Sequence, residues 1–172
     1  MKVQKMCIIA MLMAMAIAIG ILESFIPSFT IPGIKLGLAN IVILLTLYEF
    51  GIIEALIVNL GKVFIVNLVR GTIFQMGFFM SLTGALFSML VMWILIKCFK
   101  KLTPVVISVL GAISHVIGQF VIAIIFLQNI NIIYYAPILL LTSTGTGILV
   151  GIIVILVRKT NVLQNLKIKY QL

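Results

Sequence analysis

Four polar side chains interrupt or follow one long apolar run, and their spacing puts them on one side of a helix. They lie within or just after residues 53–69: Asn59, Lys62, Asn67 and Arg70. At about 100° per residue these positions cover roughly 140° of a helix, so their side chains can point into one cavity. Buried polar groups indicate either internal hydrogen bonds or contact with a ligand. The alternatives are that Lys62 extends to the interface with water and that Arg70 anchors the helix end there.

A second polar face lies in the apolar residues 104–127. It combines small residues with hydrogen-bonding ones: Ser108, Gly111, Ala112, His115 and Gln119, with Gly118 close by. His115 and Gln119 are one helical turn apart, beside glycines that let another helix or a ligand approach closely. This arrangement favours contact with a polar substrate, and a purely structural hydrogen bond of His115 is the alternative.

The segment from Pro32 to Asn40 combines a rigid turn, a flexible glycine, a cation and an amide. Its candidate ligand contacts are Lys35 and Asn40, with chain rigidity as the alternative role of the proline. Residues 142–147, rich in threonine and glycine, are assigned to helix packing, with ligand contact as the alternative. The predicted substrate-binding residues are therefore Lys35, Asn40, Asn59, Lys62, Asn67, Arg70, His115 and Gln119.

The residues that metal-dependent and nucleophilic enzymes need are missing or scattered. The chain has no aspartate, and its three glutamates fall in a predicted loop and a predicted turn: Glu23, Glu49 and Glu54. Magnesium-diphosphate chemistry needs clustered carboxylates. The pair Gly61-Lys62 lacks the other residues of a phosphate-binding loop. With a single histidine and no metal or disulfide pattern around Cys7 or Cys98, we expect no enzyme acting alone, no metal site and no covalent cofactor.

Composition indicates that lipid is the solvent of this chain. Of 172 residues, 64% are hydrophobic and 9% are charged, and the mean hydropathy is +1.40. A spanning helix needs roughly 20 apolar residues, so the chain holds about six spans and no soluble domain. The predicted fold is an all-α integral membrane bundle, residues 1–172, with spans near 6–22, 36–50, 53–69, 77–96, 104–127 and 136–157.

Three of these spans have alternative interpretations. The second and third are short and are separated by the polar turn around Glu49, which predicts two short helices joined by a tight turn. One long re-entrant element is the alternative. The first span, which follows Lys2 and Lys5, could also be a cleaved signal peptide, although its length suits a span.

The net charge of +9 is concentrated beside the apolar segments. Basic residues gather near both ends of the chain and between the fourth and fifth spans, which predicts a multi-pass protein of the cell membrane with both termini in the cytoplasm. Residues 23–35, 70–75 and 128–131 then lie outside. The same pattern favours lipid headgroups over nucleic acid as the anionic partner.

Three alanines, Ala10, Ala14 and Ala18, recur at every fourth position of the first span. They share one helix face and leave a groove that another helix can approach closely. This pattern predicts a partner-binding face, with packing inside the protein as the alternative.

Three stretches together carry a family resemblance: PGIKLGLAN at 32–40, SLTGALFS at 81–88 and GAISHVIGQ at 111–119. They resemble the Gx transporter family, which is often labelled heptaprenyl diphosphate synthase component I. That family in turn looks like the substrate-binding S components of energy-coupling factor (ECF) vitamin transporters. The resemblance implies a six-helix fold, docking of a coupling subunit with paired ATPases through the alanine motif, and capture of a small-molecule substrate from outside.

Three functions are therefore considered. The first is an ECF-type transporter subunit that binds a small anionic or polar cofactor or precursor. The second is a non-catalytic membrane partner of polyprenyl diphosphate or menaquinone synthesis. The third is a proton-coupled carrier that uses His115 and Glu54.

Overall fold

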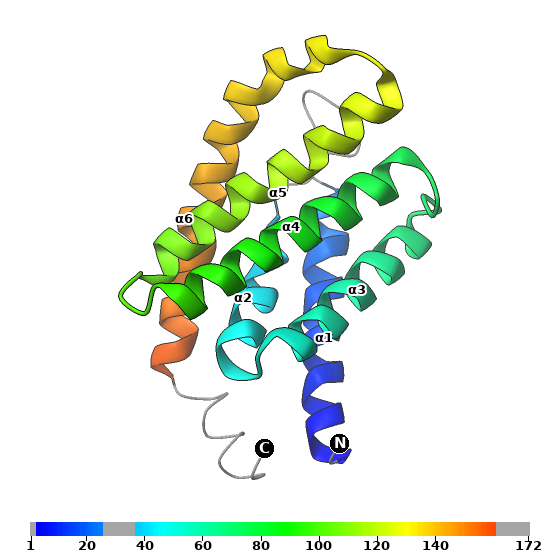
Figure 1. The fold of residues 1–172 in the computed structure, drawn as a ribbon. Coiled ribbons are helices and arrows are strands. Elements are labelled where there is room, and N and C mark those ends of the chain that lie inside the picture. The colour runs from blue at the N-terminus through cyan, green and yellow to red at the C-terminus, as the bar shows by residue number, and fades with distance from the viewer. Residues whose placement is uncertain (1–2, 26–36, 161–172) are drawn as a thin grey trace.

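The computed structural model describes residues 3–25 and 37–160. Within these ranges the chain is helical, and the helices follow one another in the order α1 (Val3–Ser24), α2 (Asn40–Glu49), α3 (Ile52–Val69), α4 (Met76–Cys98), α5 (Pro104–Leu127), the 3-10 helix η1 (Ile130–Tyr135) and α6 (Ala136–Lys159). The first residues of α1 and the last residues of α6 lie at the same end of the bundle (Figure 1).

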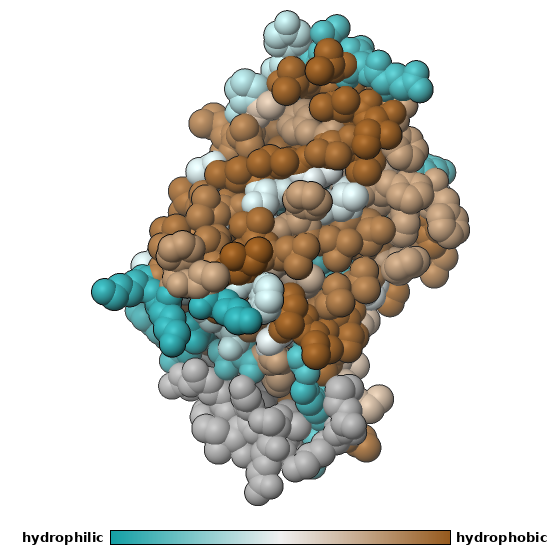
Figure 2. Space-filling view, in the orientation of Figure 1, coloured by the Kyte–Doolittle hydropathy of each residue, from teal (hydrophilic) through white to brown (hydrophobic). Residues whose placement is uncertain are grey.

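Five of the described helices are long and apolar enough to cross a membrane, and α2 is shorter, with 10 residues. The chain is therefore an integral membrane helical bundle, as its composition predicted. Figure 2 shows hydrophobic residues across the middle of the visible face and hydrophilic residues toward its ends. At 1.5 Å per residue, α2 is about 15 Å long, roughly half the hydrocarbon thickness.

Helix α2 occupies the interior of the bundle, where it contacts α1, α3, α4 and α6. Residues 42–47 are all buried, and Ile43 and Leu44 have no exposed surface. A helix covered on every side by other helices does not need to match the bilayer thickness. Around it, α5 packs against α4 on one side and α6 on the other, while α1 packs on α3 (Figure 1).

The predicted tight turn between the second and third helices is confirmed. The amides of Phe50 and Gly51 both donate to the carbonyl oxygen of Thr46, over 2.8 and 3.1 Å. Gly51 has φ +96°, a conformation that a residue without Cβ adopts at little cost. The chain therefore reverses within two residues, and α3 begins at Ile52.

Helices α4 and α5 meet at glycines. A Cβ added to Gly118 would lie 3.0 Å from the Cα of Gly84 and 3.0 Å from the carbonyl oxygen of Thr83. The hydroxyl of Thr83 donates to the Gly118 carbonyl over 3.0 Å. Two membrane helices approach this closely only where both surfaces are small.

The position of Glu23 corrects the sequence prediction. The first span was expected to end at residue 22, with Glu23 opening the outer loop, but α1 continues to Ser24 and Glu23 is buried. No proline or glycine interrupts the helix after Gly20 and before residue 25. The Glu23 carboxylate accepts a hydrogen bond from the backbone N–H of Gly37, which offsets part of the cost of burying it.

Candidate functional site

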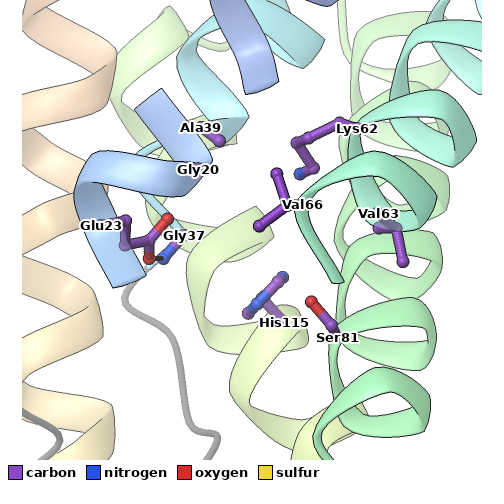
Figure 3. Close-up of a pocket in the computed structure, with 9 residues that line it drawn as sticks. All are labelled: Gly20, Glu23, Gly37, Ala39, Lys62, Val63, Val66, Ser81 and His115. Atoms are coloured by element: carbon purple, nitrogen blue, oxygen red, sulfur yellow. Dashed lines mark hydrogen bonds between the residues drawn. The ribbon is translucent and has the colours of Figure 1, made fainter. Parts of the chain in front are cut away.

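Five parts of the bundle converge on one small internal cavity (Figure 3). Its volume is about 20 Å³, enough for roughly one water molecule. It is lined by Gly20 and Glu23 of α1, Gly37 and Ala39 ahead of α2, Lys62, Val63 and Val66 of α3, Ser81 of α4, and His115 of α5. Two predicted site residues, Lys62 and His115, are thus brought together from helices far apart in the sequence.

Among the described residues that line the cavity, one is a buried cation and one is a buried anion. Lys62 and Glu23 are only 7% and 6% exposed, and both line the cavity. Within the described ranges the ion pairs with N···O distances up to 4.0 Å are Lys5–Glu54 and Arg158–Glu49. Lys62 and Glu23 are therefore charges that attract each other across the cavity without direct contact.

His115 and Gln119 are joined on the polar face of α5. Their Nε2 atoms lie 3.2 Å apart, and Gln119 is fully buried. The donor and acceptor roles in this contact depend on the tautomer of the imidazole. Figure 3 shows the His115 ring and the Ser81 oxygen facing one another.

Gly84 allows α4 to lie directly on this polar face. A Cβ at Gly84 would come within 2.9 Å of both the Gln119 side chain and the His115 carbonyl oxygen. The side-chain oxygen of Gln119 has no hydrogen-bond partner among the described residues. The predicted polar face of α5 is therefore covered by α4. The side-chain oxygen of Gln119 remains available there as a hydrogen-bond acceptor.

The three asparagines of the predicted set make other contacts and do not line the cavity. Asn40 donates to the Ser88 hydroxyl over 3.1 Å. Asn59 donates to the Ala85 carbonyl over 3.0 Å, and Asn67 donates to the carbonyl of Val63 in its own helix. These bonds link α2 and α3 to α4 or satisfy a buried amide within α3.

Two predicted cations remain, Arg70 and Lys35. Arg70 follows α3 and is exposed, so the structure does not bring it to the cavity. Lys35 lies outside the described residues. Glu54, considered with His115 for proton coupling, pairs with Lys5 and is not part of the cavity lining.

The alanine face of α1 is exposed along its whole length. Ala10, Ala14 and Ala18 are all exposed, whereas Ala16 is completely buried. Ala10 and Ala14 line an open groove of about 300 Å³ together with Met6, Ile9, Met13, Ile17 and Ile57. The three alanines therefore do not pack inside the bundle, and a groove between α1 and α3 runs beside two of them.

Glu23 and Ser81 were absent from the predicted site. The sequence places Glu23 in a loop because a charged residue commonly marks the end of an apolar run. No pattern within one sequence links Glu23 to Gly37. Ser81 is the first residue of the SLTGALFS motif, so the family resemblance could have indicated it. Among the described residues no group of His, Cys, Asp or Glu could hold a metal ion.

The fold and cavity define a multi-pass membrane bundle with a small charged interior site. The model of one family, heptaprenyl diphosphate synthase component I, matches residues 12–157. The chain belongs to this family, as its motifs suggested. No curated protein and no solved structure matches it. Family membership and the helical architecture are compatible with a non-catalytic membrane component.

Proposed function

We propose that this protein is the substrate-binding membrane subunit of an ECF-type transporter, which captures a small polar or anionic cofactor or precursor from outside the cell. The main support for this proposal is that α1 lines both the charged cavity and the exposed groove. Its inner face supplies Gly20 and Glu23 to the charged cavity, and its outer face supplies Ala10 and Ala14 to the exposed groove.

This division suits a subunit that must bind a solute and a protein partner through one helix. The cavity residues supply charge and hydrogen bonds in a setting of low dielectric, where such contacts select a ligand strongly. The groove offers methyl groups and backbone, which permit the close approach of a partner helix. A displacement of α1 on ligand binding would alter both surfaces together.

The cavity must widen before it holds a cofactor-sized molecule, because its present volume suffices for about one water. In this proposal the structure corresponds to the unliganded subunit. Substrate binding separates α1 and the residues before α2 from α3 and α5, and Lys62, Ser81 and His115 then contact the substrate.

The second candidate is a non-catalytic membrane partner of polyprenyl diphosphate or menaquinone synthesis. The observation that favours it is the family description, which names a component of a prenyl synthase. In this case a soluble catalytic subunit would use the alanine groove, and a prenyl diphosphate or its product would be the ligand.

Purification of the tagged protein from its native membrane under mild conditions separates these candidates. The transporter proposal expects recovery of a membrane coupling subunit with two ATPases, together with a retained small polar molecule found by mass spectrometry. Recovery of a soluble prenyl synthase without ATPases would contradict it and support the second candidate. As a control, the same purification of an unrelated membrane protein of similar size should recover neither set.

A further inference from the structure

We propose that the ligand of the cavity carries both an anionic and a cationic group and has no net charge. This inference rests on the proposed substrate-binding function and narrows its substrate class. The anionic group binds Lys62, and the cationic group binds Glu23. The presence of a buried acid in the same cavity as the buried lysine is the starting observation.

Charge balance argues against a purely anionic ligand. Among the described lining residues the charges of Lys62 and Glu23 balance, so an added anion would leave these residues and the ligand with a net negative charge beside a carboxylate that is 6% exposed. Unbalanced charge is costly inside a membrane bundle, because neither water nor counterions screen it. A purely cationic ligand would leave an unbalanced positive charge beside Lys62, at a similar cost in free energy.

The other polar groups of the described lining are the imidazole of His115 and the hydroxyl of Ser81. His115 contacts the uncharged amide of Gln119, with 3.2 Å between the two Nε2 atoms. In this proposal both side chains act as hydrogen-bonding groups, and the charges that select the ligand come from Lys62 and Glu23.

The positions of the two charged side chains also favour one ligand with two separate charged groups. Glu23 enters the cavity from α1 and Lys62 enters it from α3 (Figure 3). They form no direct ion pair, although each is almost completely buried. One carboxylate oxygen of Glu23 accepts the N–H of Gly37, and a cationic ligand group can use the remaining oxygen. A ligand that bridges the cavity would satisfy both side chains at once.

The probe is a metabolite extract of the expressing cells from which macromolecules have been removed, and it is applied to the purified full-length protein. Bound compounds are recovered after washing, identified by mass spectrometry and sorted by ion exchange at pH 7. The proteins compared are the wild type, Lys62→Met, Glu23→Gln and the exchanged pair Lys62→Glu with Glu23→Lys. Lys159→Met, which removes an exposed lysine of α6, is the matched control.

We expect the enriched compound to carry an acidic and a basic group. Lys62→Met and Glu23→Gln should each reduce its affinity at least tenfold, since each removes a charge-assisted hydrogen bond. The exchanged pair should recover part of the loss, and Lys159→Met should bind like the wild type. Thermal unfolding of each variant in detergent checks that the binding measurements report folded protein.

Three results would overturn the inference in different ways. Enrichment of a compound with an acidic group and no basic group, with affinity unchanged or increased in Glu23→Gln, would reject the zwitterionic class and leave substrate binding intact. No enrichment above that of an unrelated membrane protein would reject the substrate-binding function as well. Equal enrichment by wild type, Lys62→Met and Glu23→Gln, with lower thermal stability of both variants, would assign the two charges to folding.

Discussion

Arg158 and Glu49 form an ion pair of 3.3 Å that joins the end of α6 to the last residue of α2. Glu49 is only 6% exposed, whereas Arg158 is 34% exposed. The guanidinium of Arg158 also lies over the Tyr48 ring, 4.2 Å from its centroid. Because α2 is short and central, this contact holds its end against the final helix of the bundle.

Replacing Glu49 with glutamine should lower the free energy of unfolding by about 1–2 kcal/mol. A hydrogen bond to a charged group contributes roughly 1.5–3 kcal/mol, and solvent at Arg158 reduces the value for this pair. Thermal unfolding in detergent of Glu49→Gln, Arg158→Met and the double variant gives the coupling between the two side chains. Lys159→Met, next to Arg158 and exposed, is the control. Additive effects of the two substitutions would show that the pair contributes nothing.

The boundaries of the helices were largely predictable from the sequence. Charges, prolines and polar turns bound the apolar runs, and 104–127 and 53–69 were placed within one residue of α5 and α3. The largest difference is at α2, predicted at 36–50 and observed at Asn40–Glu49, and α1, predicted at 6–22, is observed at Val3–Ser24. Gly37 has φ +84°, so the backbone there is not helical. Hydrophobicity continues through such a residue and does not reveal where the helix begins.

The candidate site was only partly predictable. Helical periodicity identified Lys62 and His115, because a polar residue in an apolar helix stands out in one sequence. It placed Asn59 and Asn67 on the same face as Lys62, but each finds a nearby backbone carbonyl instead. The contact of Glu23 with the Gly37 amide depends on how α1 and the residues just before α2 are placed in space. Periodicity within one helix contains no information of that kind.

The glycine contact between α4 and α5 predicts a strong difference between two chemically identical substitutions. Gly118→Ala places a methyl group 3.0 Å from backbone atoms of Thr83 and Gly84, which cannot move without separating the helices. We expect a loss of about 1–3 kcal/mol of stability, as for other overpacked cores. Gly145→Ala is the matched control, since nothing lies within 4 Å of a Cβ there.

Thermal unfolding in detergent measures both variants. Gly145→Ala should unfold at or above the wild-type temperature, because alanine favours helix more than glycine does. Gly118→Ala should unfold several degrees lower. If the two variants unfold at the same temperature, helices α4 and α5 do not approach each other as closely as the structure describes.

The charge distribution predicts the orientation of the chain in the membrane. In a background with Cys7→Ser and Cys98→Ser, an impermeant thiol reagent should label Asn129→Cys in intact cells and should label Lys101→Cys only after the membrane is opened. Both positions are exposed, so access depends on the side of the membrane. The physical reason is the retention of lysine and arginine on the cytoplasmic side. The opposite labelling pattern would reverse the predicted topology.

The first helix offers a test of the partner-binding face, because alanines on its two sides differ completely in burial. Ala14 and Ala18 are exposed and Ala16 is 0% exposed. Ala14→Leu or Ala18→Leu should leave thermal unfolding near that of the wild type and should prevent recovery of the coupling subunit and ATPases. The larger side chain fills the space that a partner helix needs for close approach.

Ala16→Leu and Thr142→Leu complete the comparison. Ala16→Leu adds three carbon atoms to a filled core and should lower stability by about 1–3 kcal/mol or more. Thr142→Leu enlarges an exposed residue of α6 and should affect neither stability nor assembly. Affinity purification followed by protein mass spectrometry measures the partners that each variant recovers. Normal recovery with Ala14→Leu and Ala18→Leu would mean that the groove beside α1 is occupied by lipid, and the alanine face would lose its role in assembly.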